Sequence, residues 1–156
     1  MALTKGVNSY VDLVEADIYF QDRLDVAAWD EASEVEKEKA LVTSTNYLNG
    51  LNWVGFVEDI TQQLAFPRSG FYHEPKYGRE VSFDGEVPDR VIIAQMELAY
   101  HFLNNDGILD NTGKVTDLEV ASIKLKEIEE TPKLSSFVRN LLKPLLMNSK
   151  QWWRAN

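Results

Sequence analysis

Few side chains in this sequence could carry out chemistry. The chain has 156 residues, with no cysteine and only two histidines, His73 and His101. Disulfides, thiolate metal sites and cysteine nucleophiles are therefore excluded, and one chain cannot supply an imidazole-rich zinc or iron site. The adjacent pair His73 and Glu74 offers two metal-ligand side chains, which is too few to indicate a metal site.

The motifs of common enzyme classes are also missing. Neither a G-x-x-x-x-G-K-S/T phosphate loop nor a G-x-G-x-x-G turn occurs. A Ser-His-Asp triad is not indicated, because His101 falls in an apolar helical pattern and His73 in a segment rich in turn residues. The segment from Asp106 to Asp110 lacks the ligand spacing of an EF-hand. We predict a binding or assembly protein that is not an enzyme and needs no cofactor or metal.

Charge is distributed unevenly along the chain, whose formal net charge is −9. Residues 1–60 carry a net charge of −8, whereas residues 133–156 contain five basic side chains and no acidic one. The acidic balance argues against a surface that attracts nucleic acid everywhere, although a local basic patch remains compatible with it. The two ends are either solvated faces that happen to differ or complementary surfaces for head-to-tail association or docking.

The last ten residues have the composition of a binding anchor. They include Lys150, Trp152, Trp153 and Arg154, and Trp and Arg are the residue types that dominate interface hot spots. The alternative is that the two indoles fold back on the core of their own chain. We assign residues 147–156 to a C-terminal docking tail and residues 1–146 to a single domain. No apolar run approaches the roughly 18 residues of a membrane span, so we expect no membrane partner.

Capping signals and apolar periodicity predict mainly helices. Ser9 with Asp12 predicts a helix that extends to about Arg23, and the stronger capping box of Ser33 with Glu36 predicts one that extends to about Asn49. Two further helices are predicted at residues 90–104 and 134–146, the first beginning near Pro88 and central to the fold, the second ending or kinking at Pro144.

The remaining segments are less regular. Residues 51–89 contain too many glycines and prolines for a long element, so we expect a long irregular loop whose aromatic side chains are packed. Apolar residues alternate imperfectly over 114–128, which is consistent with one or two strands. The predicted fold is mainly α: a small bundle of about four to five helices with a long irregular loop and a short β-hairpin or strand pair.

The order of several short motifs resembles one family. The motifs are Ser9-Tyr-Val-Asp-Leu-Val-Glu-Ala-Asp-Ile-Tyr-Phe20, the Ala28-Trp29 pair, Trp53-Val54-Gly55, and Gln63-Leu64-Ala65-Phe66-Pro67-Arg68 followed by the Pro88 helix with Glu97. Together they resemble the DnaT-like single-stranded-DNA-binding family of tailed phages, whose members are similar to head-to-tail connector (adaptor, head-completion) proteins. The resemblance covers about residues 7–146.

The resemblance implies a structural protein of the virion. Such a protein is made in the host cytoplasm and forms a ring of about twelve identical subunits beneath the portal protein, at the head-tail interface. Its partners would be the portal, neighbouring copies, and tail or terminator proteins, while genomic DNA passes through without sequence-specific contact. In this picture the tail residues Lys150, Trp152, Trp153 and Arg154 dock on the portal.

The resemblance also assigns structural roles within the domain. The motif residues are Gln63, Leu64, Phe66, Pro67, Arg68, Pro88 and Glu97. The segment from Phe71 to Gly85 is longer and more aromatic than is usual in the family, and its residues Phe71, Tyr72, Tyr77 and Phe83 are candidates for contact with a neighbouring subunit or the tail. We further expect Phe66 to be buried against the central helix and Arg68 to pair with Glu97, because a carboxylate on an apolar helix needs a partner.

A replication factor that binds single-stranded DNA is the alternative function. It would use the basic segment 133–156 for phosphate contacts and the indoles of Trp152 and Trp153 for base stacking.

Overall fold

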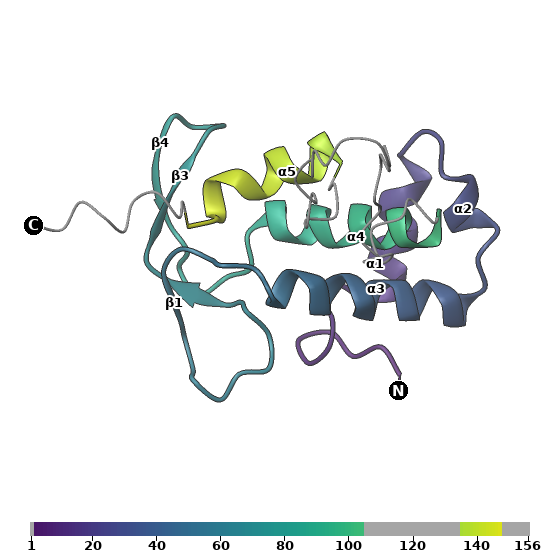
Figure 1. Ribbon diagram of the computed structural model, residues 1–156, viewed down its shortest axis with the longest axis horizontal. Coiled ribbons are helices and arrows are strands. Elements are labelled where there is room, and N and C mark those ends of the chain that lie inside the picture. Colours follow the sequence, from purple (N-terminus) through teal and green to yellow (C-terminus); the bar gives the residue numbers. More distant parts are fainter. Residues whose placement is uncertain (1, 105–134, 148–156) are drawn as a thin grey trace, which may run out of the picture.

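Five α-helices and two pairs of short antiparallel strands make up residues 2–104 and 135–147, the part of the chain that the computed structural model describes (Figure 1). This confirms the mainly helical fold class. The elements follow one another as α1 (Leu13–Gln21), α2 (Ala27–Asp30), α3 (Glu34–Asn49), β1 (Phe56–Val57), β2 (Arg68–Ser69), β3 (Phe71–Glu74), β4 (Arg79–Ser82), α4 (Asp89–Leu103), α5 (Ser136–Leu142) and the 3-10 helix η1 (Lys143–Leu145).

The first helix begins later than the sequence pattern predicted. Asp12, not Ser9, is its N-cap: the Asp12 carboxylate accepts from the Glu15 amide at 2.8 Å, and Glu15 accepts from the Asp12 amide at 2.9 Å. Ser9 is buried instead, where its hydroxyl accepts from the side chain of Gln95 at 2.6 Å and donates to the Val11 carbonyl. The prediction was wrong because two overlapping capping patterns occur here, and burial of Ser9 selects the second.

The boundaries of α3 and α4 agree with the predictions, whereas α2 was not predicted and α5 is shorter than the predicted helix over 134–146. Ser33 and Glu36 form the expected capping box of α3, which ends at Asn49 with Gly50 as its C-cap. Pro88 stands immediately before α4, which extends to Leu103. Pro144 lies in η1, directly after the end of α5, because proline cannot continue the α-helical hydrogen-bond ladder.

Residues 51–89 are more ordered than an irregular loop. Strands β1 and β2 pair with Phe56 opposite Ser69, and β3 and β4 form a hairpin in which Phe71 pairs with Ser82. As predicted, no long element occurs over 51–89, but the segment contains the two strand pairs, which the sequence analysis did not place there. Strands of two to four residues are too short to show a periodic pattern, and their flanking glycines and prolines concealed them. The strands expected over 114–128 lie outside the described residues.

Two glycines allow the backbone before β1 to lie close to the end of β2. Gly55 and Gly70 have φ values of +74° and +118°, a conformation that side chains other than glycine rarely adopt. A Cβ atom on Gly55 would lie 2.3 Å from the carbonyl oxygen of Ser69, and one on Gly70 would lie 3.2 Å from the Cα of Gly55. The backbone therefore cannot take this path with larger residues at position 55.

The hydrophobic core consists of two clusters that share α4. One cluster lies toward the strands, and its largest members are Tyr10, Trp53, Phe66 and Phe83. The other lies beneath α1 and α2, and its largest members are Phe20, Trp29, Leu41, Met96 and Tyr100. Phe66 is buried as predicted, and it packs edge-to-face on Trp53 and Phe83.

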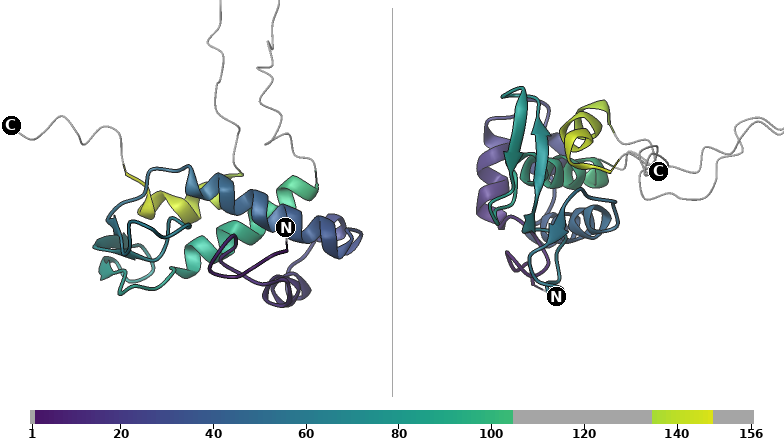
Figure 2. Two further views of the ribbon diagram at one scale, coloured as in Figure 1. Left: turned by 90° about the horizontal axis from the view of Figure 1, so that it is seen from below. Right: turned by 90° about the vertical axis from the view of Figure 1, so that its left-hand side faces the viewer.

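The molecule has two different ends. Figures 1 and 2 show α3 and α4 side by side along its length, with the strands at one end and α2 at the other. We call these the hairpin end (β1–β4) and the helical end (α2, the start of α3 and the end of α4). The chain returns to the hairpin end after η1, where the Leu145 carbonyl accepts from Val54 and the Met147 amide donates to Asn52, each at 2.9 Å. None of the described helices is long and apolar enough to cross a membrane.

Candidate interaction surfaces

Glu97 has a buried ionic partner, but the partner is Arg23. Its carboxylate accepts from Arg23 Nε at 2.7 Å and from a terminal guanidinium nitrogen at 3.0 Å, while the Tyr19 hydroxyl donates to it at 2.6 Å. The side chain of Glu97 is 3% exposed. The predicted Arg68–Glu97 pair was therefore wrong, although the expectation that this carboxylate needs a cation was confirmed.

The same arginine shapes the turn between α1 and α2. Arg23 donates to the carbonyls of Leu24 and Asp25 at 3.0 Å each, and its guanidinium lies 4.4 Å from the centre of the Tyr100 ring. Burial, reinforced by the hydrogen bond to Glu97, raises the pKa of Tyr19. Although burial alone would lower the pKa of Arg23, its hydrogen bonds to Glu97 raise it. The group is therefore a fixed ion pair that joins α1 to α4.

Arg68 bonds to main-chain carbonyls instead of a carboxylate. Its guanidinium donates to the carbonyls of Val54 at 2.8 Å and Gly55 at 2.6 Å, with longer bonds to Ala65 and Trp53. Five donors in a planar fork suit this set of acceptors. Burial, unrelieved by any carboxylate partner, lowers the pKa of Arg68. The residue fixes the two arms of the β1–β2 loop to each other, which is a structural role.

A neighbouring glutamine, which the sequence analysis overlooked, supports the same loop. The Gln62 side-chain amide donates to the carbonyls of Leu64 at 2.6 Å and Pro67 at 3.0 Å. Leu64 is buried, whereas the motif residue Gln63 is exposed. No sequence signal distinguishes the two glutamines, because they are adjacent and lie outside any periodic element.

A second ion pair attaches the hairpin to α4. Glu74 accepts from Arg90 Nε at 2.8 Å and from a terminal nitrogen at 2.5 Å, and from the Lys76 amide at 3.0 Å. The hydrogen bonds from Arg90 lower the pKa of Glu74 to about 2 against the opposing effect of burial. Glu74 therefore belongs to an ion pair and is not held ready for a metal with His73. The described residues contain no group of three metal-ligating side chains.

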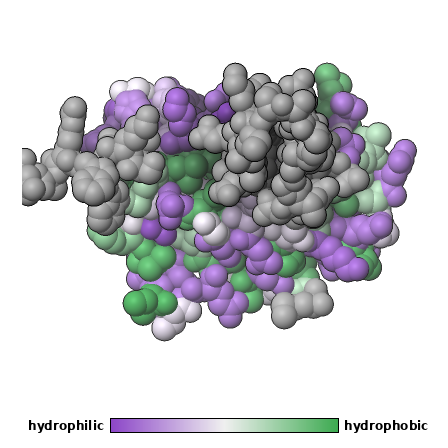
Figure 3. Space-filling model, in the orientation of Figure 1, coloured by the Kyte–Doolittle hydropathy of each residue, from purple (hydrophilic) through white to green (hydrophobic). Residues whose placement is uncertain are grey.

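The hairpin end exposes several large hydrophobic side chains, which Figure 3 shows gathered on this part of the surface. Phe56 is 79% exposed, Ile60 93%, Phe71 68% and Tyr77 58%. Of the four residues predicted as a contact loop, Phe71 and Tyr77 thus face solvent. Phe83 is buried and Tyr72 stacks on it with ring centres 4.9 Å apart, so these two belong to the core.

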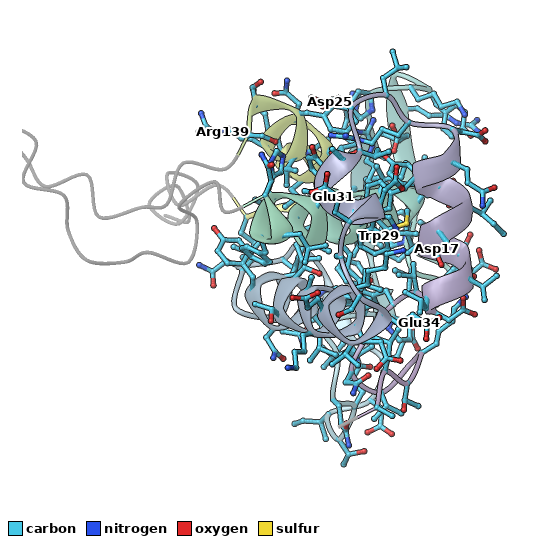
Figure 4. The ribbon with its side chains drawn as sticks, turned by 90° about the vertical axis from the view of Figure 1, so that its right-hand side faces the viewer. Asp17, Asp25, Trp29, Glu31, Glu34 and Arg139 are labelled. Carbon is cyan, nitrogen blue, oxygen red and sulfur yellow. The ribbon has the colours of Figure 1, made fainter. Side chains whose placement is uncertain are left out.

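The helical end is acidic. Residues 12–38 contain ten Asp and Glu but only two Lys and Arg. Figure 4 looks onto this end and shows Asp17, Asp25, Glu31 and Glu34 arranged around Trp29. Asp17 is engaged, since it accepts from the Trp29 indole at 2.9 Å and from Lys37 at 3.0 Å. Glu31 and Glu34 are exposed carboxylates.

A shallow groove of about 420 Å³ opens at the helical end. It lies between α2, the start of α3 and the end of α4, and its lining comprises Ala27, Ala28, Glu31, Ala32, Glu36, Leu103 and Asn104. The hydrogen bonds from Ser33 lower the pKa of Glu36. The groove therefore combines small apolar side chains with two carboxylates. The predicted tail residues 150–154 lie outside the described residues.

Comparisons with known proteins gave one match. The model of a family described as "Putative DnaT-like ssDNA binding protein" matches residues 2–156. No curated protein matches the chain, and no solved structure does.

Proposed function

This chain belongs to the DnaT-like family, and from that premise we propose that it is a structural adaptor of a tailed bacteriophage. In this role it forms a ring beneath the portal protein, joins the head to the tail and continues the DNA channel. It acts as a component of the virion neck, made in the host cytoplasm, and it catalyses no reaction.

The placement of charge on the described residues is the observation that carries this proposal. Acidic side chains there outnumber basic ones by eighteen to ten. Half of the basic groups are already held by partners within the chain: Lys5 by Glu15, Arg23 by Glu97, Lys37 by Asp17, Arg90 by Glu74, and Arg68 by carbonyls. Such a surface does not grip phosphates, and a channel wall must let DNA slide past it.

The two ends supply the second requirement of a ring. Copies in a closed ring meet through two different faces of the subunit. The hairpin end exposes several aromatic side chains, whereas the helical end carries carboxylates and a groove, so the two faces differ in chemistry. We infer that free subunits associate weakly and that the ring forms on the portal, where bound neighbours raise the effective concentration.

Electron microscopy with the portal protein tests the adaptor role. The full chain is purified, mixed with the portal of the same phage and imaged by negative stain, with each protein alone as control. We expect extra density in a ring on one face of the portal and no stable ring from the chain alone. Failure to bind the portal at any concentration would contradict the adaptor role.

Binding of single-stranded DNA is the second candidate, and the description of the family favours it. At the hairpin end, Phe71 and Tyr77 are exposed near Lys76 and Arg79, and the Lys76 amine lies 5.4 Å from the centre of the Tyr77 ring. Exposed aromatic rings beside cations are what stacking proteins use to hold unpaired bases. The basic residues after 133 would add phosphate contacts.

An oligonucleotide gel shift at several salt concentrations distinguishes the two functions. A single-stranded-DNA-binding protein should bind tightly at low salt, lose affinity steeply as salt rises, and weaken further in Phe71→Ala and Tyr77→Ala. The matched control is Ile60→Ala, which removes an even more exposed hydrophobic side chain that cannot stack. For an adaptor we expect no binding that these aromatic variants change.

A further inference from the structure

The groove at the helical end has the chemistry of a receptor for a basic aromatic peptide. Ala27, Ala28, Ala32 and Leu103 give it apolar walls without bulky side chains, and Glu31 and Glu36 place two carboxylates at the same site. Indole rings suit such walls and cations suit the carboxylates.

Two stretches of this chain are candidates to fill the groove, and charge separates them. Residues 105–134 begin beside the groove but contain seven acidic side chains against four basic ones. Residues 148–156 contain Lys150 and Arg154, no acidic side chain, and both Trp152 and Trp153. An acidic groove repels the first stretch and attracts the second.

The length of the C-terminal segment decides whether it can bind the groove of its own molecule or only that of a second one. Met147 is bonded to Asn52, just beyond the last turn of α3, whereas the groove lies at the first turn. The sixteen residues of α3 span about 24 Å at 1.5 Å per residue. The four residues from Met147 to Gln151 reach about 14 Å at full extension. Even at full extension, Gln151 therefore falls short of the groove of its own chain, whereas the groove of a second copy imposes no such limit.

We propose that the groove of one copy binds the segment Lys150–Arg154 of a second copy, with the indoles against the alanines and the basic groups against Glu31 and Glu36. This rests on the proposed function and deepens it, because it names the contact that joins neighbouring subunits. The contact is head-to-tail, so each copy offers one groove and one tail, which is the kind of contact that a closed ring repeats. The receiver of the tail is then a neighbouring copy and not the portal.

Site-directed disulfide cross-linking tests this proposal. Because the sequence has no cysteine, only the introduced thiols can react. One pool of full-length chain carries Ala27→Cys in the groove and a second, tagged to a different mass, carries Gln151→Cys in the tail. The pools are mixed and oxidised mildly with copper phenanthroline, and the mixed disulfide dimer is followed on a gel. We expect it to form about tenfold faster than random collision gives, because docking raises the local thiol concentration.

The control pairs Gln151→Cys with Ile60→Cys, which is 93% exposed at the hairpin end. Equal rates for the two pairs would overturn the proposal. So would an intramolecular disulfide, without mixed dimer, in a chain that carries both Ala27→Cys and Gln151→Cys. A third pairing replaces Gln151→Cys with Ser122→Cys. If the mixed dimer forms only with Ser122→Cys, the groove binds residues 105–134 and the proposal is wrong.

Charge exchange provides a second, non-covalent measurement. Glu31→Lys and Arg154→Glu should each weaken self-association in sedimentation velocity, and the chain with both changes should recover it. Asp30→Lys is the control, because Asp30 is exposed beside the groove but does not line it. If cross-linking fails while the chain still forms a ring on the portal, this inference is wrong and the adaptor role stands. If neither occurs, the proposed function fails as well.

Discussion

At the scale of single residues, the ion pair of Arg23 and Glu97 is the most deeply buried charge interaction among the described residues. Glu97 lies in α4 and Arg23 in the turn that follows α1, 74 positions away in the sequence. A buried charge that loses its partner keeps the cost of desolvation without the attraction.

Glu97→Gln should therefore lower the free energy of unfolding by about 3–5 kcal/mol. The measurement is urea unfolding at neutral pH. Glu80→Gln serves as the control, because Glu80 is exposed on β4, and it should change stability by less than about 0.5 kcal/mol. If the two variants unfold at the same urea concentration, the pair does not stabilise the fold.

A substitution at Arg68 tests whether the shape of its guanidinium group matters in addition to its positive charge. Arg68→Lys keeps the positive charge but cannot donate to the separate carbonyls of Val54, Gly55 and Ala65 at once. We expect a loss of about 2 kcal/mol in the free energy of unfolding, since carbonyls of the loop lose charged donors. Arg79→Lys, on the exposed face of the hairpin, should be silent. Equal stability of Arg68→Lys and the parent would show that charge alone suffices at this position.

At the scale of elements, the hairpin depends on one carboxylate for its attachment to α4. In the unfolded chain the carboxyl of Glu74 has its ordinary pKa of 4.5, and in the folded chain Arg90 lowers the pKa to about 2. The ionised form is thus favoured by folding, so its stabilisation is complete above pH 4.5 and is lost as the pH falls from 4.5 toward 2.

Glu74→Gln should cost about 3 kcal/mol at pH 7, the free energy that corresponds to this change in pKa. Because the parent loses the same contribution in acid, the difference between parent and variant should shrink as the pH falls below 4.5. Urea unfolding of both proteins at several pH values between 7 and 3 measures it. A difference that stays constant with pH would contradict the assignment.

Two glycines at positive φ, one crowded and one in open space, allow a matched comparison. In Gly55→Ala the residue has a positive φ and its Cβ would lie only 2.3 Å from the carbonyl oxygen of Ser69. In Gly78→Ala the φ is also positive, but no atom lies within 4 Å of the Cβ. Gly78→Ala should cost about 1 kcal/mol and Gly55→Ala at least twice as much. Thermal unfolding of the two variants compares them directly, and equal costs would mean that the strands move apart without penalty.

The helices were predictable from the sequence and the strands were not, for reasons of length. Helix α3 has sixteen residues and a capping box, so neighbouring residues in the sequence indicate both its start and its helical period. Strands of two to four residues carry no such pattern. The need of Glu97 for a cation could likewise be predicted from its apolar helix, but the choice of Arg23 over Arg68 depends on how distant elements pack.

At the scale of the whole molecule, the two ends carry different exposed groups: aromatic side chains such as Phe56 and Phe71 at the hairpin end, and carboxylates such as Glu31 and Glu34 at the helical end. The acidic N-terminal half could be predicted from the sequence. The groove could not, because residues from α2, α3 and α4 line it together. The hairpin end could not be foreseen either, since its exposed and buried aromatic residues alternate within one short segment: Phe71 faces solvent and Phe83 the core.

The two core clusters each contain one buried tryptophan, Trp29 or Trp53, and α4 contributes side chains to both. Replacement of Trp152, Trp153 and either buried indole by Phe would leave a single fluorophore that reports on one cluster. Because the shared helix cannot detach from one cluster while still packed in the other, the two reporters should show coincident denaturation midpoints. Because α4 is buried over most of its length and packs in both clusters, we expect the molecule to unfold as one unit, so that neither end melts while the other stays folded.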